Sequence, residues 1–278
     1  MESIPFGVSR LDRIVDGGAP PGSVVLLVGE PGAGAREFVF TSATMNALHG
    51  VDDDLFELYY GDVHEESVPP NEVHYLSFTA DESSLRQEMS YVFDDTIVDT
   101  AGDRIRFRDF SAEYFRPSPI PHEWYAGEAK TLRDLGERHS GEPVLTALGD
   151  YLDDNAADNL VVIDSVTDLV AAVSDDMSWN DLSMVMRGIT KAAHRWGGLI
   201  LAVVSRDTLE PTQLGHLMDA VDGTLQFQWE TGGSKRARTL VVQEFRGVLS
   251  RLESEDIVRF ETQIHDGGFD VSDVRKIR

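Results

Sequence analysis

Three glycines within residues 24–38 give this sequence its clearest candidate for binding a phosphate group. The segment reads VVLLVGEPGAGAREF, an apolar run followed by a glycine-rich turn and then a helical pattern. Gly29, Gly32 and Gly34 permit a sharp turn that directs successive backbone N–H groups into one concavity. We therefore predict a buried strand, a phosphate-binding loop and a helix that begins at about Ala35. The loop comprises Gly29, Glu30, Pro31, Gly32, Ala33, Gly34, Ala35 and Arg36.

The two loop positions that would carry side-chain chemistry are both substituted. In the full motif, G-x-x-x-x-G-K-[ST], the lysine contacts the β- and γ-phosphates and the hydroxyl ligates magnesium. Here these positions are Ala35 and Arg36. Loss of the lysine costs about 1.5–3 kcal/mol in binding, and a guanidinium cannot ligate a cation. Arg36 could itself contact a phosphate, but we expect an exposed arginine at the start of a helix.

Alternating strands and helices are predicted to position this loop. Strand-like segments occur at Val73–Phe78, Arg104–Phe110, Leu160–Ile163 and Leu199–Val204, and helical patterns at 36–48, 82–93, 144–153 and 179–196. Three more strand-like segments follow, at Val221–Trp229, Arg238–Phe245 and Ile257–Thr262. This order predicts an α/β fold with a mostly parallel sheet and helices on both faces. Ligands bind such sheets beyond the carboxyl ends of the strands.

The segment before the loop carries a second and more specific pattern. It contains, in order, Gly7, Leu11, Asp12, Gly17, Gly18, Pro20 or Pro21, Gly22 and Ser23. Followed by a strand and a glycine loop, this pattern resembles the KaiC/RadA branch of the RecA-like P-loop ATPases, over about residues 4–271. The resemblance implies one RecA-like domain over 1–278, with C-terminal antiparallel strands and insertions at about 49–71 and 111–141. It also implies ATP and Mg²⁺ as the cofactors of the family.

The resemblance assigns roles to two residues far from the loop. Asp164, which ends a buried strand, matches the Walker B carboxylate that holds magnesium, although an aspartate in this place can also simply cap a turn. Arg246 matches an arginine that acts on the nucleotide of a neighbouring subunit. Its companion lysine is replaced by Glu244, which would oppose γ-phosphate binding.

The acidic pair that activates water in the family is also missing. The matching positions after the second strand are Thr79 and Ala80. Asp81 and Glu82 lie two residues further on, which displaces a carboxylate by several Å. We expect them to cap the following helix, with Ser84 as a partner of Asp81.

These substitutions predict a protein that keeps the fold but not the hydrolysis. We expect a degenerate P-loop protein, a pseudo-ATPase, that regulates or scaffolds a protein partner or an active paralogue and binds nucleotide weakly at most. One alternative is an active ATPase that uses Arg36 for phosphate and Asp81 or Glu82 for water. Another is a recombinase-like DNA-repair accessory protein with basic residues at 235–238 and 274–278, which we interpret instead as a turn and a solvated tail.

Composition limits the partners of the chain. Its 49 acidic residues against 24 basic ones give a net charge of −25, which resembles proteins of salt-accumulating archaea and opposes nucleic-acid binding. At molar salt the Debye length falls to about 3 Å, so most of these acids are read as solvated surface. The absence of cysteine excludes disulfides and thiolate metal sites. No apolar run approaches the roughly 20 residues of a membrane span, so we expect a cytoplasmic protein.

The second insertion is rich in aromatic residues and proline. Its aromatic residues include Tyr114, Phe115, Trp124 and Tyr125. Such a segment is either a loop packed on the domain or a surface that binds a partner. We expect the packed loop, because aromatic side chains in long loops usually anchor them.

Overall fold

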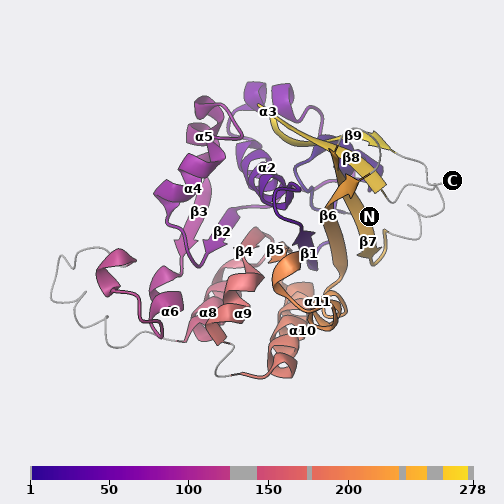
Figure 1. Cartoon of the computed structure of the whole chain (residues 1–278). Helices are drawn as coiled ribbons and strands as arrows, with labels where there is room; N and C mark the ends of the chain where they lie inside the picture. Colours follow the sequence, from indigo (N-terminus) through magenta and orange to yellow (C-terminus); the bar gives the residue numbers. More distant parts are fainter. Residues whose placement is uncertain (1, 126–142, 174–176, 232–235, 249–258, 275–278) are drawn as a thin grey trace.

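A single sheet organises the computed structural model, which describes residues 2–125, 143–173, 177–231, 236–248 and 259–274 (Figure 1). Within these ranges nine strands pair in the order β3-β2-β4-β5-β1-β6-β7-β8-β9. The parallel strands are β1 (Ser23–Gly29), β2 (Val73–Ser77), β3 (Ile105–Asp109), β4 (Leu160–Asp164), β5 (Leu199–Ser205) and β6 (Gly223–Thr231). The antiparallel strands are β7 (Arg236–Phe245), β8 (Arg259–His265) and β9 (Gly268–Val274).

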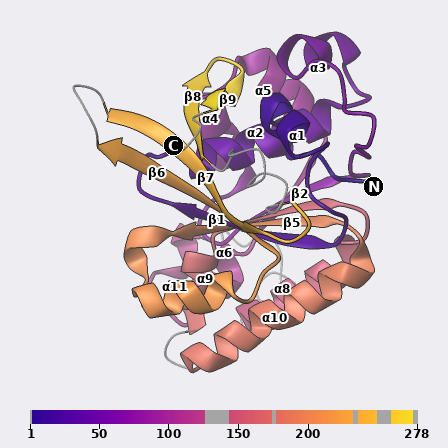
Figure 2. The same cartoon turned by 90° about the vertical axis from the view of Figure 1, so that its right-hand side faces the viewer.

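Helices cover both faces of the sheet, as Figures 1 and 2 show. One face carries α1 (Ser9–Ile14), α2 (Ala35–Leu48), α3 (Asp53–Tyr59), α4 (Glu82–Met89) and α5 (Asp95–Gly102). The other carries α6 (Ser111–Phe115), α8 (Val144–Asn155), α9 (Val166–Val173), α10 (Trp179–Trp196) and α11 (Pro211–Met218). Two short 3-10 helices are η1 (His122–Trp124) and η2 (Arg206–Thr208). The arrangement confirms the predicted α/β fold with a mostly parallel sheet and C-terminal antiparallel strands.

Strand β1 shows why the two faces are both buried. Val25 and Leu27 point into the core on the α2 side, whereas Val24, Leu26 and Val28 belong to the core on the α10 side. Successive side chains of a strand point to opposite faces, so a continuous apolar run suits a central parallel strand covered by helices on both sides.

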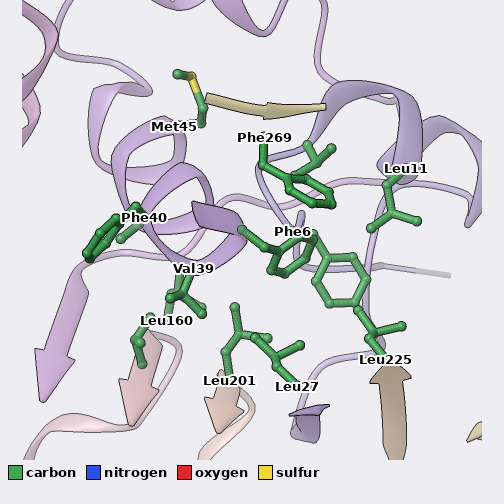
Figure 3. Close-up of a cluster of buried hydrophobic side chains, with 14 of the residues drawn as sticks. Phe6, Leu11, Leu27, Val39, Phe40, Met45, Leu160, Leu201, Leu225 and Phe269 are labelled. Carbon is green, nitrogen blue, oxygen red and sulfur yellow. The ribbon is translucent and has the colours of Figure 1, made fainter. Parts of the chain in front are cut away.

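Helix α2 is the centre of the first core. Phe38 contacts the rings of Phe6, Phe227 and Phe269 at centroid distances of 6.0, 5.3 and 5.4 Å. Figure 3 shows Phe6 and Phe269 in this cluster beside Leu27 and Leu225. The helix that follows the glycine loop is therefore fixed by the N-terminal segment, by β6 and by the closing hairpin β8–β9.

Most predicted elements are confirmed, but several helices were not predicted. The segment 49–71, predicted as a surface excursion, contains α3 and the buried Tyr60. Outside the insertions, α5, α9 and α11 were not predicted. In the second insertion the structure forms α6 and η1, residues 126–142 lie outside the described ranges, and Trp124 is 78% exposed rather than packed.

Candidate functional site

The glycine loop follows β1 at the carboxyl edge of the parallel strands. Gly29, at the end of β1, pairs in register with Ser205 of β5 and Phe227 of β6. Gly32 and Gly34 have φ values of +71° and +110°, a region that glycine adopts without the strain other residues incur. A Cβ atom at Gly34 would also lie 2.9 Å from the ring of Phe269. The predicted loop and its glycines are thus required by the backbone path and by the packing of β9.

The loop presents backbone donors at the start of α2. Among the described residues, the N–H groups of Gly32, Gly34 and Ala35 have no hydrogen-bond acceptor in the protein, whereas Ala33 N donates to Glu30 O at 3.0 Å. N–H groups at the N-terminus of a helix favour a phosphate or another anion. This part of the site therefore keeps the properties of a phosphate cradle.

Arg36 occupies the centre of the site and pairs with carboxylates of two other elements. Its Nη2 atom lies 3.0 Å from Asp164 Oδ2 at the end of β4, and its Nη1 atom lies 3.2 Å from Glu88 Oε2 of α4. The hydroxyl of the buried Tyr75, on β2, donates to the same Asp164 oxygen at 2.7 Å. The side chain of Arg36 is 45% exposed and that of Asp164 only 8%. Arg36 is thus an exposed arginine at a helix start, as predicted, but its guanidinium pairs with two carboxylates, which was not predicted.

The surroundings of Arg36 and Tyr75 keep both side chains protonated. Partial burial lowers the pKa of Arg36, but the neighbouring Asp164, Tyr75 and Glu88 together raise it by more, so the guanidinium stays charged. Burial and the neighbouring Asp164 raise the pKa of Tyr75 well above its ordinary value. Tyr75 therefore keeps its proton and donates a hydrogen bond to Asp164, while the charge of Arg36 offsets that of the carboxylate.

The side chains of this cluster do not fit a magnesium ion. Asp164 is present, but its Oδ2 atom already accepts from both Arg36 and Tyr75. A guanidinium has donors only and repels a cation, and position 36 supplies no hydroxyl. With Arg36 in its observed position, the positive charge that magnesium provides in the complete motif comes from the protein itself.

The acids after β2 serve the following helix, as expected for Asp81. Asp81 Oδ1 accepts from Ser84 N at 2.8 Å and from the Ser83 hydroxyl at 2.8 Å, which makes it the N-cap of α4. These hydrogen bonds lower the pKa of Asp81. Glu82 pairs with Arg86, four residues further along the helix, at 2.8 Å. Both carboxylates are thus engaged in helix formation.

Arg246 lies at the opposite end of the sheet from the glycine loop. Its Nη1 atom is 3.3 Å from Asp222 Oδ1, just before β6 begins. The other oxygen of Asp222 accepts from Val24 N at 3.1 Å, near the start of β1. Because the loop follows the end of β1, Arg246 cannot act on a ligand held by the loop of the same chain. Glu244 pairs in register with Thr224 on β6.

A set of contacts that the sequence did not reveal holds the loop against the β6–β7 hairpin. Glu30 accepts from Arg206 Nη1 at 2.6 Å and from Trp229 N at 2.9 Å. The indole of Trp229 donates to Pro31 O at 3.0 Å. These contacts tie the first half of the loop to η2 and to β6.

Arg238 completes this clamp from the neighbouring strand. Its Nε atom donates to Gly32 O at 2.9 Å, and its guanidinium lies 4.7 Å from the ring centre of Trp229. The register of β6 and β7 places Trp229 directly opposite Arg238. The interpretation of residues 235–238 as a basic turn is therefore wrong for Arg238, which belongs to a strand and supports the loop. Lys235 lies outside the described residues.

The described residues form neither a metal-binding cluster of side chains nor a membrane-spanning helix. No group of three or more histidine or acidic side chains there could hold a metal ion. No helix in the same ranges is long and apolar enough to cross a membrane.

Comparison with solved structures gives the fold a wider context. The sheet order, the loop after β1 and the antiparallel C-terminal strands define a RecA-like α/β protein. A crystal structure of a KaiC-like protein from the hyperthermophilic archaeon Pyrococcus horikoshii OT3 matches with a TM-score of 0.62 and 15% sequence identity, over 98% of this chain and 99% of that one. No family model matches the sequence, and no curated protein matches it.

Proposed function

We propose that this chain is a KaiC-like P-loop protein that does not hydrolyse ATP and instead regulates or scaffolds a protein partner, such as an active paralogue. The structural similarity to a KaiC-like protein supports the P-loop architecture. The observation that carries the loss of hydrolysis is the Arg36–Asp164 ion pair at 3.0 Å. It engages the one metal-binding carboxylate that the motif retains.

The remaining catalytic positions support the same conclusion. Ala35 provides no charge to the γ-phosphate. Asp81 and Glu82, the candidates for relocated water activation, are used by α4. Contacts made only in the transition state account for most of the rate in phosphoryl transfer, so the loss of several of them together leaves little hydrolysis.

The loop keeps a role as an anion site that needs no metal. Its unpaired N–H groups and the positive end of α2 attract phosphate oxygens, and the half-exposed Arg36 adds a cation close to them. ATP is therefore proposed as a weak ligand whose binding does not depend on magnesium.

Calorimetric titration with ATP, with and without magnesium, tests this function. The native chain should bind ATP weakly, with the same affinity in both conditions, and should show no turnover. The double variant A35K/R36S rebuilds the G-K-S sequence and frees Asp164. It should gain magnesium-dependent binding of at least about tenfold, since one charge-assisted contact is worth about 1.5–3 kcal/mol.

Two controls separate the possible outcomes. R36S alone frees Asp164 without adding the lysine and should gain less than the double variant. Magnesium-dependent turnover of the native chain that disappears in D164N would overturn the proposal and identify an active ATPase.

The protein partner is proposed from the surface of the molecule. Large apolar side chains are exposed at separate places, with Leu58 at 72%, Tyr91 at 76% and Trp124 at 78%. Exposed aromatic and aliphatic residues are common anchors of protein interfaces. DNA is a poorer candidate, because the chain carries a net charge of −25 and Arg238 is committed to the loop.

A further inference from the structure

An open cavity lies between α1, α2, α3 and the turn that joins β8 to β9. Its volume is about 210 Å³, and its lining includes Arg10 and Arg13 from α1 and His265 from the end of β8. Thr41 and Met45 of α2 also line it. These residues lie six and ten positions beyond Ala35, which at 1.5 Å per residue is roughly 9–15 Å along the helix from the glycine loop. The cavity is therefore separate from the site described above.

Two arginines face this cavity from one side of a helix. Residues three positions apart on a helix are neighbours, and like charges there repel. Arg10 is held in place, because its Nη1 atom donates to Val271 O at 3.0 Å and to Ser272 O at 2.9 Å. Among the described residues Arg13 has no ion-pair partner, in a chain with 49 acidic residues. An anionic ligand would relieve the repulsion between the two guanidinium groups.

Neutral donors complete the lining. The Nδ1 atom of His265 accepts from Gly267 N at 3.0 Å. In the neutral ring the proton is therefore on Nε2, which makes that nitrogen a donor. Ser9 contributes a hydroxyl to the same cavity. Arginine forks, hydroxyls and imidazole N–H groups together are the donors that bind phosphate oxygens.

The base of the cavity is fixed by hydrogen bonds that leave little freedom to the tyrosines. Tyr60, 5% exposed, donates to the buried Asp12 at 3.0 Å. Tyr59 donates to Asp94 at 3.3 Å. Asp12 in turn accepts from the backbone N–H groups of residues 6, 7 and 8 at 2.7–3.1 Å. The wall that carries the arginines is thus anchored to the rest of the core.

The local charge differs from that of the molecule as a whole. The acidic residue in the lining is Asp270, 4.0 Å from Arg10 Nε. By contrast, the cavity beside α11 is lined by Asp207, Asp219 and Glu244 against a single arginine, Arg206. A cavity with more basic than acidic side chains stands out on a protein of net charge −25.

We propose that this cavity binds the phosphate group of a small ligand, as a second anion site independent of the glycine loop. The volume of the cavity exceeds that of one phosphate group. The cavity therefore has room for inorganic phosphate and also for a small phosphate monoester, and the two ligands present the same phosphate oxygens. Arg10 and Arg13 provide the charge, and Ser9 and His265 provide further donors.

Titration calorimetry with inorganic phosphate, at constant ionic strength, tests this site on the full chain. Wild type should bind phosphate there, and R13Q should bind it about ten- to a hundredfold more weakly. R195Q removes another exposed arginine, on α10, and should bind as wild type does. R36S reports on the glycine loop and should leave this site unchanged. Repeating the titration with glycerol phosphate shows whether inorganic phosphate or a phosphate monoester binds more tightly.

Amide chemical shifts provide a second measurement that does not depend on heats. In wild type, phosphate should shift the N–H signals of Gly61 and Gly267, next to Arg13 and His265, and R13Q should abolish both shifts. Equal affinities of wild type and R13Q, or equal weakening in R195Q, would overturn the proposal. Loss of the same binding in R36S but not in R13Q would assign it to the glycine loop instead.

Discussion

At the scale of single residues, one arginine changes the chemistry of the loop. Arg36 stands where the complete motif has a magnesium-binding hydroxyl, and its guanidinium contacts Asp164 and Glu88. A metal ion contributes charge only when it is bound, whereas this cation is always present. The charge of the Asp164 carboxylate is therefore offset without a cofactor. Arg36 and Tyr75 both donate hydrogen bonds to this carboxylate.

The stability of the native chain should reflect this ion pair. We expect D164N and R36S each to lower the free energy of unfolding by about 1–2 kcal/mol, because removing one partner leaves a partly buried charge unpaired. The value is below that of a fully buried pair, since Arg36 is 45% exposed and is screened by solvent.

Chemical denaturation of D164N, of R36S and of the double variant R36S/D164N measures the coupling free energy between the two side chains. The double variant should lose less than the sum of the single losses. Additive losses would show that Arg36 and Asp164 do not stabilise one another, and that Asp164 is available to a metal.

The N-cap of α4 gives a second prediction at this scale. Asp81→Ala should cost about 1 kcal/mol, whereas Asp81→Asn should cost little, because asparagine also caps helices. The hydrogen bonds to Asp81 lower its pKa. Its contribution is therefore present above pH 4 and is lost as the pH falls through its folded pKa.

Thermal unfolding of both variants between pH 2 and pH 7 checks this role. Glu82→Gln is a matched control that removes only the pair with Arg86. If Asp81 instead activated water, Asp81→Asn would abolish an ATPase activity. Unchanged stability of Asp81→Ala would make the helix-capping account fail.

At the scale of elements, the β6–β7 hairpin acts as a support for the loop. Four of its groups hydrogen-bond to the loop: the backbone N–H and the indole of Trp229, the guanidinium of Arg238, and the carbonyl of Phe227, which accepts from Glu30 N at 2.9 Å. The N–H groups of Gly32, Gly34 and Ala35 take no part in these contacts. The hairpin therefore holds the loop in a form that leaves these three N–H groups unpaired within the described part of the chain.

Hydrogen exchange should reveal this support. In R238A the amide of Ala33, which donates to Glu30 O, should exchange about tenfold faster, since one hydrogen bond and a cation–π contact are lost, together worth about 1–2 kcal/mol. Amides of β4 and β5 should be unaffected. R187A removes an exposed arginine of α10 and serves as the control. Unchanged exchange at Ala33 would show that the loop keeps its form without the hairpin.

At the scale of the whole molecule, the two ends of the sheet carry different groups. The glycine loop, Arg36 and Asp164 lie at the carboxyl edge of the parallel strands, and Arg246 lies at the other edge beside Asp222. Any contact between Arg246 and a ligand of the loop thus requires a second copy of the chain, and this role of Arg246 stays a prediction.

The net charge gives a prediction for the entire chain. Raising KCl from 0.1 M to 1 M should increase the unfolding temperature, because the Debye length falls from about 10 Å to about 3 Å and acidic groups repel one another less. Most of the increase should occur below about 0.5 M, where screening changes fastest. A linear rise that continues to 3 M would indicate strengthened apolar burial instead, and no rise would contradict the idea of a salt-adapted surface.

Local sequence patterns determined much of this protein. The positive φ angles of the loop favour glycine, so the loop could be located from Gly32 and Gly34. Apolar runs predicted most strands, and helical periods predicted α2, α4, α8 and α10. Asp81 was identified as a cap because its partners are three residues away or fewer. Such features depend on neighbours in the chain, which the sequence displays directly.

The contacts that define the site were decided only by the tertiary structure. Arg36 and Asp164 are 128 residues apart, and Gly32 and Arg238 are 206 apart. Whether such side chains meet depends on strand order, on register and on the rotation of α2 over the sheet. The sequence showed which catalytic groups were missing. The packing of β1, β4 and β7 around one edge of the sheet decided that Arg36 would pair with Asp164 and that Arg238 would support the loop.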